Sequence, residues 1–518
     1  MPGRIMNLEA QIERLNKIGI ALSSETDLEK LLELIVYEAR EFSRADAGSL
    51  YIIENDRLYF RVAQNSTLDR RNGPNSGFKP YPLPLSEKSI AGYVALKGDI
   101  INIDDVYQLP DTVPYSFNPE FDVRNDYRTT SMLVVPMKDR DGEILGVLQL
   151  INAMDEEGRV VPFDKALEPL VMSLGSQAAV AIRNAKLISE IRGLFRALIQ
   201  YSASAIDARS PHTAGHSRRV AAYATAIAKA INRENSGRFA NIYFSDEEIE
   251  ELNYSAWLHD IGKIGVPESV LDKKYRLSPE TEKLIVARFE LIKSLAVNRI
   301  YMGTIKGAKD ISLANPKKDQ EILRMKDEIQ NDLEFILKVN RSGYISDEDL
   351  SRLRGIANKT YVDLDGEVRP YITEKELECL SVRRGNLTNE EYKKVQGHVL
   401  QTLKIVGNIP FTKNLKNIPF FAASHHEMLD GSGYPRGLKG EELPVQSRIL
   451  AVVDIYDALT AIDRPYRRSL PPEKAYEILK SEAAKGRLDQ DIVELFFEKE
   501  LYKEEDDSFS KDSRKTHN

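Results

Sequence analysis

The sequence predicts a multidomain protein in which an α+β domain precedes an all-helical bundle that carries a large charged insertion. Strand-like hairpins between two helical segments predict the first part, over residues 8–185. Helical periodicity with helix-capping signals predicts the bundle, over 210–274 and 387–500. A highly charged stretch without histidine, 275–386, separates the two halves of the bundle. A chain of 518 residues is long enough for about two to four domains.

The first domain is expected to contain an antiparallel sheet flanked by helices. Residues 8–45 have the aliphatic spacing of a helix, with Asp27 as a cap. Two alternating stretches predict hairpins that turn at 54–56 and at 139–142. Helical periodicity returns over about 163–204. A helix, antiparallel strands and a closing helix together predict an α+β domain.

Residues 186–209 are expected to form a connecting helix. Its aliphatic residues follow one another at intervals of four, three and four positions, at Leu187, Ile191, Leu194 and Leu198. This spacing is typical of a short coiled-coil seam and predicts a homodimer. An ordinary amphipathic helix that lies on its own domain explains the same pattern, so both interpretations stay open.

The helical part has clear start signals. Ser210 and Pro211 predict the start of a first helix, and Ser245 with Glu248 forms a capping box for the next. A second capping box is formed by Thr388 with its glutamate three residues later. The polar tail, 501–518, is expected to be disordered.

The composition excludes several classes of protein. Against 80 acidic residues there are 72 basic ones, and the resulting charge of −8 argues against duplex nucleic acid as a partner. The single cysteine, Cys379, excludes disulfides and thiolate-rich metal sites. No uncharged apolar run approaches the roughly 20 residues of a membrane span, and the start lacks a signal-peptide pattern. A cytoplasmic protein with no membrane contact is therefore expected.

The histidines are the most informative feature of the sequence. Six of the seven fall between residues 212 and 426, and most lie on the apolar stripes of predicted helices. They are His212, His216, His259, His398, His425 and His426. Asp260, Asp454 and Asp457 accompany them on inward faces. Because unpaired buried charge is expensive, bound metal ions are the economical explanation, and so many ligands imply two or three ions.

Such a site suits phosphoester hydrolysis. Two metal ions about 3.5 to 4 Å apart lower the pKa of an attacking water and stabilise an in-line displacement at phosphorus. In the loop HHEMLDGSGYPRG, glycines permit close backbone approach to a ligand and Tyr434 offers a ring and a hydroxyl. Lys263, Arg464 and Arg467 are interpreted either as phosphate contacts or as solvated cations near helix ends.

Five motifs together resemble the HD-GYP family, a branch of the HD phosphohydrolases that degrades the bacterial messenger cyclic di-GMP. They are HTAGHSRRV (212–220), LHDIGKIGVP (258–267), GHVLQTLKIV (397–406), HHEMLDGSGYP (425–435) and AVVDIYDALTAIDRPYR (451–467). They occur in the family's order and cover roughly 195–275 and 386–495.

The resemblance implies a helical bundle around two or three divalent ions, iron most often and manganese in some members. The implied ligands are His216, His259, Asp260, His398, His425, His426 and Asp454, with Asp260 bridging. Lys263, Tyr434, Arg464 and Arg467 are the implied contacts to the cyclic dinucleotide, with Asp457 either contacting it or supporting a metal ligand. Asp260 and Lys263 are the implied catalytic residues. His212 stands where some members bind a third metal and others do not.

Two departures from the family pattern concern the bundle. About 110 residues, 275–386, intervene where the family runs on directly, and this insertion is interpreted as a lid, a partner surface or a barrier to substrate. The segment before Arg464 also has one extra residue, which leaves the placement of Arg464 and Arg467 open.

The first domain resembles the GAF family of sensory domains. The residues Asn152–Ala153 and Phe163–Asp164–Lys165 depart from the pattern of GAF domains that bind cyclic nucleotides. The domain is therefore expected either to sense another small molecule or to act as a ligand-free dimerisation module.

The leading hypothesis is a phosphodiesterase that opens cyclic di-GMP to pGpG, with either pGpG or GMP as the end product. Either Lys263 or a metal-bound water is expected to protonate the leaving oxygen. A catalytically silent dinucleotide receptor and an HD hydrolase for another phosphoester, such as a hybrid cyclic dinucleotide, are the alternatives.

Overall fold

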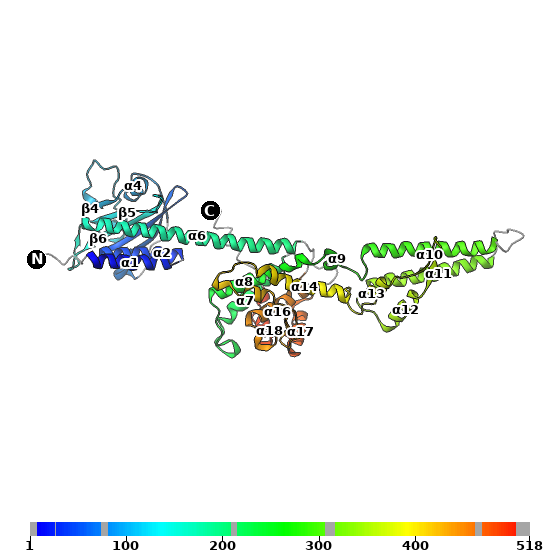
Figure 1. Ribbon diagram of the computed structural model, residues 1–518. Helices are drawn as coiled ribbons and strands as arrows, with labels where there is room; N and C mark the ends of the chain where they lie inside the picture. The colour runs from blue at the N-terminus through cyan, green and yellow to red at the C-terminus, as the bar shows by residue number, and fades with distance from the viewer. Residues whose placement is uncertain are drawn as a thin grey trace. The chain divides into compact units, whose positions relative to one another are not determined.

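The computed structural model describes residues 8–25, 27–73, 81–208, 215–305, 316–461 and 469–503. The chain divides into two compact units, 1–195 and 196–518 (Figure 1). Each unit is described by itself. Within the described residues, no helix is both long enough and apolar enough to cross a membrane.

The first unit is built on an antiparallel sheet with the strand order β3-β2-β1-β6-β5-β4, and β7 pairs with β6. The strands are β1 (Ala45–Glu54), β2 (Arg57–Asn65), β3 (Tyr81–Pro84), β4 (Ile101–Ile103), β5 (Met132–Lys138), β6 (Ile144–Met154) and β7 (Val160–Val161). Both predicted hairpins are confirmed, as β1–β2 and β5–β6.

Helices cover both faces of this sheet (Figure 1). Helices α1 (Leu8–Ser24), α2 (Leu28–Ser43) and α6 (Glu168–Asp207) pack on one face, and α4 (Ile90–Lys97) packs on the other. The short helices α3 (Ser66–Asn72) and α5 (Glu120–Asn125) lie in the connections between strands. Neighbouring strand residues face opposite cores, as the two-residue period requires. Leu50 packs with α1, α2 and α6, whereas Tyr51 packs with α4. The predicted α+β class is confirmed.

One helix prediction in this unit was wrong. The segment 8–45 forms two helices, α1 and α2, because the chain leaves the helical conformation before Asp27. The Asp27 side chain accepts a hydrogen bond from the Lys30 amide and so begins the second helix.

The second unit is helical. Its helices outside the insertion are α7 (His216–Ile231), α8 (Asp246–Leu258), α9 (Glu268–Leu271), α14 (Asn389–Val406), α15 (Ile418–Ala422), α16 (Val445–Thr460), α17 (Pro472–Ala484) and α18 (Gln490–Glu498). The capping boxes predicted before α8 and α14 are both present. The predicted helix start at Ser210–Pro211 lies outside the described residues. Helix α7 begins at His216, directly after Gly215, which has a left-handed conformation with φ of 69°.

The charged stretch 275–386 folds around a hydrophobic core of its own. Its elements are α10 (Pro279–Ile305), α11 (Pro316–Arg341), α12 (Asp347–Ala357), β8 (Thr360–Val362), β9 (Val368–Pro370) and α13 (Glu374–Leu380). Phe289 of α10, Ile336 of α11 and Leu353 of α12 are fully buried together. Figure 1 shows α10 and α11 side by side in green. Most of the charge of this stretch therefore lies on the surface of a folded helical module, with Arg276 as a fully buried exception.

After α18 the chain forms a 3-10 turn at Leu501–Lys503, and Leu501 is buried. Order therefore continues past residue 501, where the disordered tail was expected to begin. Residues 504–518 lie outside the described part.

Candidate metal centre

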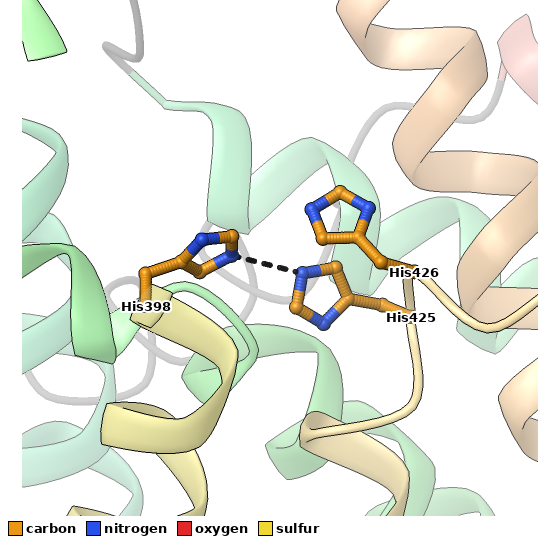
Figure 2. A group of neighbouring side chains, drawn as sticks. All are labelled: His398, His425 and His426. Atoms are coloured by element: carbon orange, nitrogen blue, oxygen red, sulfur yellow. Dashed lines mark hydrogen bonds between the residues drawn. The ribbon is translucent and has the colours of Figure 1, made fainter. Parts of the chain in front are cut away.

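Four helices and one loop bring the predicted ligands together. His216 is the first residue of α7, and His259 and Asp260 follow directly after α8. His398 lies on α14, and Asp454 lies on α16. Histidines 425 and 426 come from the loop after α15, and Figure 2 shows their rings beside that of His398. Segments far apart in the sequence thus meet at one buried place.

The first group consists of His216, His259 and Asp260, whose ligand atoms lie within 4.8 Å of one another. The two imidazole Nε2 atoms are 3.1 Å apart. Asp454 is near the group: its Oδ1 is 3.3 Å from His216 Nε2 and 3.7 Å from His259 Nε2. All four side chains are buried, and the most exposed of them, that of Asp454, is 11% exposed.

The second group consists of His398, His425 and His426, again with ligand atoms within 4.8 Å. The Nε2 atoms of His398 and His425 face each other at 3.4 Å (Figure 2). The His426 ring lies 4.1 Å from the His425 ring, centroid to centroid. His426 Nδ1 is also 3.8 Å from Asp454 Oδ2, so Asp454 reaches both groups.

Asp260 lies between the two groups. Its Oδ2 is 3.4 Å from His216 Nε2 and also 3.4 Å from His259 Nε2. Its Oδ1 is 3.3 Å from His398 Nε2 and 4.0 Å from His425 Nε2. One carboxylate therefore directs one oxygen to each group, which is the arrangement required of a ligand shared by two ions.

Backbone carbonyls determine which ring nitrogen faces this centre. The Nδ1 atoms of His259, His398 and His425 lie 2.6, 2.6 and 2.7 Å from the carbonyl oxygens of the residues three positions earlier. A carbonyl only accepts, so each Nδ1 carries the proton and donates. In the neutral imidazole, each Nε2 is then an acceptor that faces other acceptors. A divalent cation satisfies such a set of imidazole and carboxylate atoms, so the residues fit a metal centre.

The pKa values differ between the two groups. Burial lowers the pKa of His398, and it lowers the pKa of His425 well below the ordinary value, so both rings are neutral. Burial also lowers the pKa of His426, to about 4. In the first group burial is outweighed: Asp260 and Asp454 raise the pKa of His259 to about 9.

The pKa of the Asp260 carboxyl group is also strongly shifted. Burial raises its pKa, but Lys263 and the neighbouring imidazoles outweigh burial and hold it well below its usual range. Lys263 Nζ donates a hydrogen bond to Asp260 Oδ2, and its side chain is 22% exposed. Lys263 therefore lies at the boundary between the buried carboxylate and solvent.

Close packing holds the turn after α8 against α14. The Thr402 hydroxyl donates to the His259 carbonyl at 2.9 Å and accepts from the Gly262 amide at 3.0 Å. A Cβ atom at Gly262 would lie 2.0 Å from the His398 carbonyl oxygen, so only glycine fits there. The sequence interpretation did not identify Thr402. Its place one turn after His398 on the same apolar stripe was the available signal.

The loop after His426 is organised by a buried glutamate that was not predicted. Glu427 is 2% exposed and accepts from the Arg436 amide at 2.8 Å and the Leu438 amide at 3.0 Å. A Cβ atom at Gly433 would lie 2.4 Å from the Met428 amide nitrogen. The resulting turn places the Tyr434 ring 4.8 Å from the His426 ring, and burial raises the pKa of its hydroxyl.

Asp457 contacts protein groups and is 1% exposed. One of its oxygens is 2.7 Å from His216 Nδ1, and the other accepts from Arg219 Nε at 2.6 Å. This geometry favours support of a histidine over contact with a ligand. Arg219 was not predicted, although it follows His216 by three residues on α7.

Three predicted site residues cannot be placed. His212, Arg464 and Arg467 lie outside the described residues. The other ten of the thirteen predicted residues lie at the centre or beside it. Eight form it or contact it directly, and these are His216, His259, Asp260, Lys263, His398, His425, His426 and Asp454, with Tyr434 and Asp457 next to them.

Comparison with known domain families gives three matches. A family described as "GAF domain" matches residues 27–182. Two families described as "HD domain" match residues 213–314 and 375–492. The two HD matches together contain every described residue of the candidate metal centre.

Curated relatives include proteins named as phosphodiesterases. A Vibrio cholerae protein named 3'3'-cGAMP-specific phosphodiesterase 3 is 26% identical over 275 residues, which is 53% of this chain and 32% of that protein. A second, 3'3'-cGAMP-specific phosphodiesterase 1, is 39% identical over 114 residues, 21% of this chain and 25% of that protein. A Thermotoga maritima cyclic di-GMP phosphodiesterase is 37% identical over 142 residues, 26% of this chain and 36% of that protein. The matched regions thus span between a quarter and little more than a third of these relatives.

Proposed function

This chain joins a GAF domain to an HD domain, and from that premise we propose that it is a metal-dependent phosphodiesterase that hydrolyses cyclic di-GMP to pGpG. The observation that carries the proposal is the position of Asp260, with one oxygen toward each of two groups of histidine acceptors. The names of the relatives support a cyclic dinucleotide as the substrate class.

We propose two divalent ions, iron or manganese, as the cofactor. His216, His259 and Asp260 would hold one ion, His398, His425 and His426 the other, and Asp454 lies within reach of both groups. When bound, such ions act as Lewis acids toward the phosphodiester and lower the pKa of an attacking water. A third ion would require His212.

The protein's own side chains would bind and orient the substrate. Lys263 lies at the solvent edge of the centre, where its ammonium group would contact a phosphate oxygen and stabilise negative charge at phosphorus. The Tyr434 ring lies 4.8 Å from that of His426 and, half-buried beside the centre, would contact the dinucleotide ring. Burial raises the pKa of the Tyr434 hydroxyl, so it stays protonated and can donate a hydrogen bond. Arg464 and Arg467 remain proposed phosphate contacts.

The test is hydrolysis by the full chain, purified without oxygen and loaded with iron or manganese. Cyclic di-GMP is expected to be converted to pGpG, and Asp260→Asn is expected to abolish both turnover and metal retention. An Asp246→Asn variant on the exposed first turn of α8 is the matched control. Binding of cyclic di-GMP by the metal-loaded protein without turnover would identify a receptor and overturn the enzymatic proposal.

A second substrate is favoured by a specific observation. Two of the relatives above are named as specific for 3'3'-cGAMP. The two dinucleotides share the same phosphodiester ring and differ in one base, so the metal centre cannot distinguish them. Relative kcat/KM values for cyclic di-GMP, 3'3'-cGAMP and a cyclic mononucleotide would assign the substrate.

We further propose that the GAF domain regulates this activity in a homodimer, either by sensing a small molecule or by dimerisation alone. Asn152, at a position used by nucleotide-binding GAF domains, is buried and bonds the Thr130 amide at 2.7 Å. Its amide nitrogen also donates to the Tyr127 hydroxyl. These internal bonds support the expectation that the domain does not bind a cyclic nucleotide.

A further inference from the structure

Two loops at the base of the insertion have the same local pattern. Each has a glycine, an aliphatic residue two positions later, a helix-capping hydroxyl three positions later and a carboxylate six positions later. The two sets are Gly343, Ile345, Ser346 and Asp349, and Gly385, Leu387, Thr388 and Glu391. The first loop joins α11 to α12, and the second joins α13 to α14.

The two loops contact each other directly. Tyr344 and Arg384 form an antiparallel bridge. The Gly385 amide donates to the Gly343 carbonyl at 3.2 Å, and the Ile345 amide donates to the Arg383 carbonyl of the second loop at 3.1 Å. The base of the insertion is therefore a pair of helix–loop–helix units joined through their loops.

The pattern is that of calcium-binding helix–loop–helix units, which have glycine at the sixth loop position and a bidentate glutamate at the twelfth. Such units also need oxygen ligands at the first, third and fifth positions. Here these positions hold Lys338, Asn340 and Ser342 in the first loop and Leu380, Val382 and Arg384 in the second. The second loop thus keeps the glutamate but lacks the other acidic ligands.

Two cationic side chains of the protein meet the oxygens of these loops. Lys273 Nζ lies 2.7 Å from each carboxylate oxygen of Glu391, and the Lys273 side chain is only 5% exposed. This contact is bidentate at the twelfth position of the second loop. The Lys273 carbonyl also accepts from the Asn386 amide group.

The second cation is Arg276, which is fully buried. Its Nη1 donates to the Val339 carbonyl at 2.9 Å and to the Ser342 carbonyl, both at the first loop. Its Nε donates to the Val382 carbonyl of the second loop at 3.0 Å. One guanidinium group therefore binds main-chain oxygens of both loops.

We propose that Lys273 and Arg276 are built-in cations that close this pair of loops without a bound metal, and that Lys273, through Glu391, holds α14, and with it His398, in place for the metal centre. The inference rests on the proposed metal-dependent function. Lys273 and Arg276 are positioning residues, since they act through Glu391 and the loops.

The chain connectivity explains why such contacts are needed. The chain leaves the bundle next to Lys273 and returns next to Glu391, so their ion pair joins the two crossing points of the insertion. Glu391 lies in the first turn of α14, seven residues (398 − 391) before His398. Removal of one partner would leave a buried charge unpaired and release the start of α14.

The test uses the full chain and Mn²⁺ as the probe, followed by the electron paramagnetic resonance signal of free Mn²⁺. Lys273→Gln is expected to weaken Mn²⁺ binding about tenfold, as for residues that orient metal ligands. Glu391→Gln should have the same effect, because glutamine keeps the capping box but removes the charge. Lys273→Arg keeps the positive charge and the ion pair with Glu391, and should therefore bind Mn²⁺ about as tightly as the wild type.

The matched control is Lys394→Gln. Lys394 pairs with Glu390 on the exposed surface of the same helix, at 2.8 Å, and its loss should leave Mn²⁺ affinity unchanged. Unchanged affinity in both Lys273→Gln and Glu391→Gln, with Mn²⁺ still bound by the wild type, would overturn the inference alone. A wild-type protein that binds no Mn²⁺ would overturn the proposed function first, and this inference with it.

A second measurement tests the loops themselves. Millimolar Ca²⁺ should leave the wild-type thermal unfolding midpoint of the metal-free protein unchanged, because the protein already supplies the cations. A rise in that midpoint that disappears in Glu391→Gln would show that the second loop binds a cation and would overturn the proposal.

Discussion

His216 Nδ1 lies 2.7 Å from Asp457 Oδ2, and the guanidinium of Arg219 binds the same carboxylate from the other side. Burial raises the pKa of Asp457, but His216 and Arg219 outweigh burial and lower it. The carboxylate is therefore charged and fixes the Nδ1–H tautomer of His216, which leaves Nε2 free to face the centre.

Asp457→Asn is expected to weaken metal binding by about 10- to 100-fold, because an amide can present its NH2 group to His216 and no longer selects the tautomer. Mn²⁺ titration of the metal-free protein measures the change. Asp491→Asn, which removes an exposed partner of Arg238, is the control. A changed KM for cyclic dinucleotide with unchanged metal affinity would instead assign Asp457 to substrate binding.

Gly262→Ala is expected to lower the free energy of unfolding of the helical unit by about 1 to 3 kcal/mol or more, because the new methyl group overlaps the His398 carbonyl and the Thr402 amide. The displaced α14 should also bind metal more weakly. Denaturant unfolding and Mn²⁺ titration measure the two effects.

Gly355→Ala is the matched control for that substitution. Gly355 lies inside α12, and a Cβ atom there would meet no other atom within 4 Å. Alanine should therefore stabilise α12 by about 0.5 to 1 kcal/mol and leave metal affinity unchanged. Equal destabilisation by the two alanines would contradict the close packing of Gly262.

Metal binding is expected to release protons at neutral pH. Burial lowers the pKa of His259, but Asp260 and Asp454 raise it to about 9, so the metal-free protein holds a proton there at pH 7. Ligating imidazole is neutral, so apparent metal affinity should rise with pH until about 9 and then level off. Calorimetric titration with Mn²⁺ in buffers of different ionisation enthalpy counts the released protons, and a count of zero at pH 7 would contradict the prediction.

The same pKa sets the stability of the metal-free protein. A folded-state pKa raised above the unfolded value of 6.5 contributes stability that is fully present below pH 6.5 and is lost as the pH rises to about 9. The free energy of unfolding of metal-free protein should therefore fall over this window. His259→Gln should remove this part of the pH dependence, and a wild-type protein whose stability rises over the window would contradict the assignment.

The exposed apolar residues of α6 predict a dimer. Leu187, Ile191, Leu194 and Leu198 are 47, 63, 72 and 65% exposed in the single chain, as expected of a seam that a second copy would cover. Leu194→Glu is expected to convert a dimer to a monomer in sedimentation equilibrium, whereas Ser189→Glu, off this seam, should not. A wild-type monomer at all concentrations would exclude the coiled coil.

Short stretches of sequence were sufficient to predict both hairpins and the starts of α8 and α14. The β1–β2 and β5–β6 hairpins and the capping boxes at Ser245 and Thr388 follow from residue alternation and from side chains three positions apart. The start of α7 at His216 was not predicted, because a glycine inside an otherwise helical pattern does not by itself show that it adopts the left-handed conformation that Gly215 has.

The module within 275–386 could not be predicted from its composition. Its charged residues cover a core that helices α10 to α13 form only by packing on one another. The matching loops at Gly343 and Gly385 went unrecognised because their usual acidic ligands are absent, and the compensating cations lie more than 60 residues before the first loop, Lys273 just before the module and Arg276 at its start.

The sequence by itself determined which chemical groups the protein has: six imidazoles and a few carboxylates at helical spacing, without thiolates, which restricts a metal centre to nitrogen and oxygen ligands. Only the tertiary structure decided how these groups are used. The two-sided position of Asp260 and the support of His216 by Asp457 depend on side chains from helices far apart in the chain, and no local pattern encodes the distance between them.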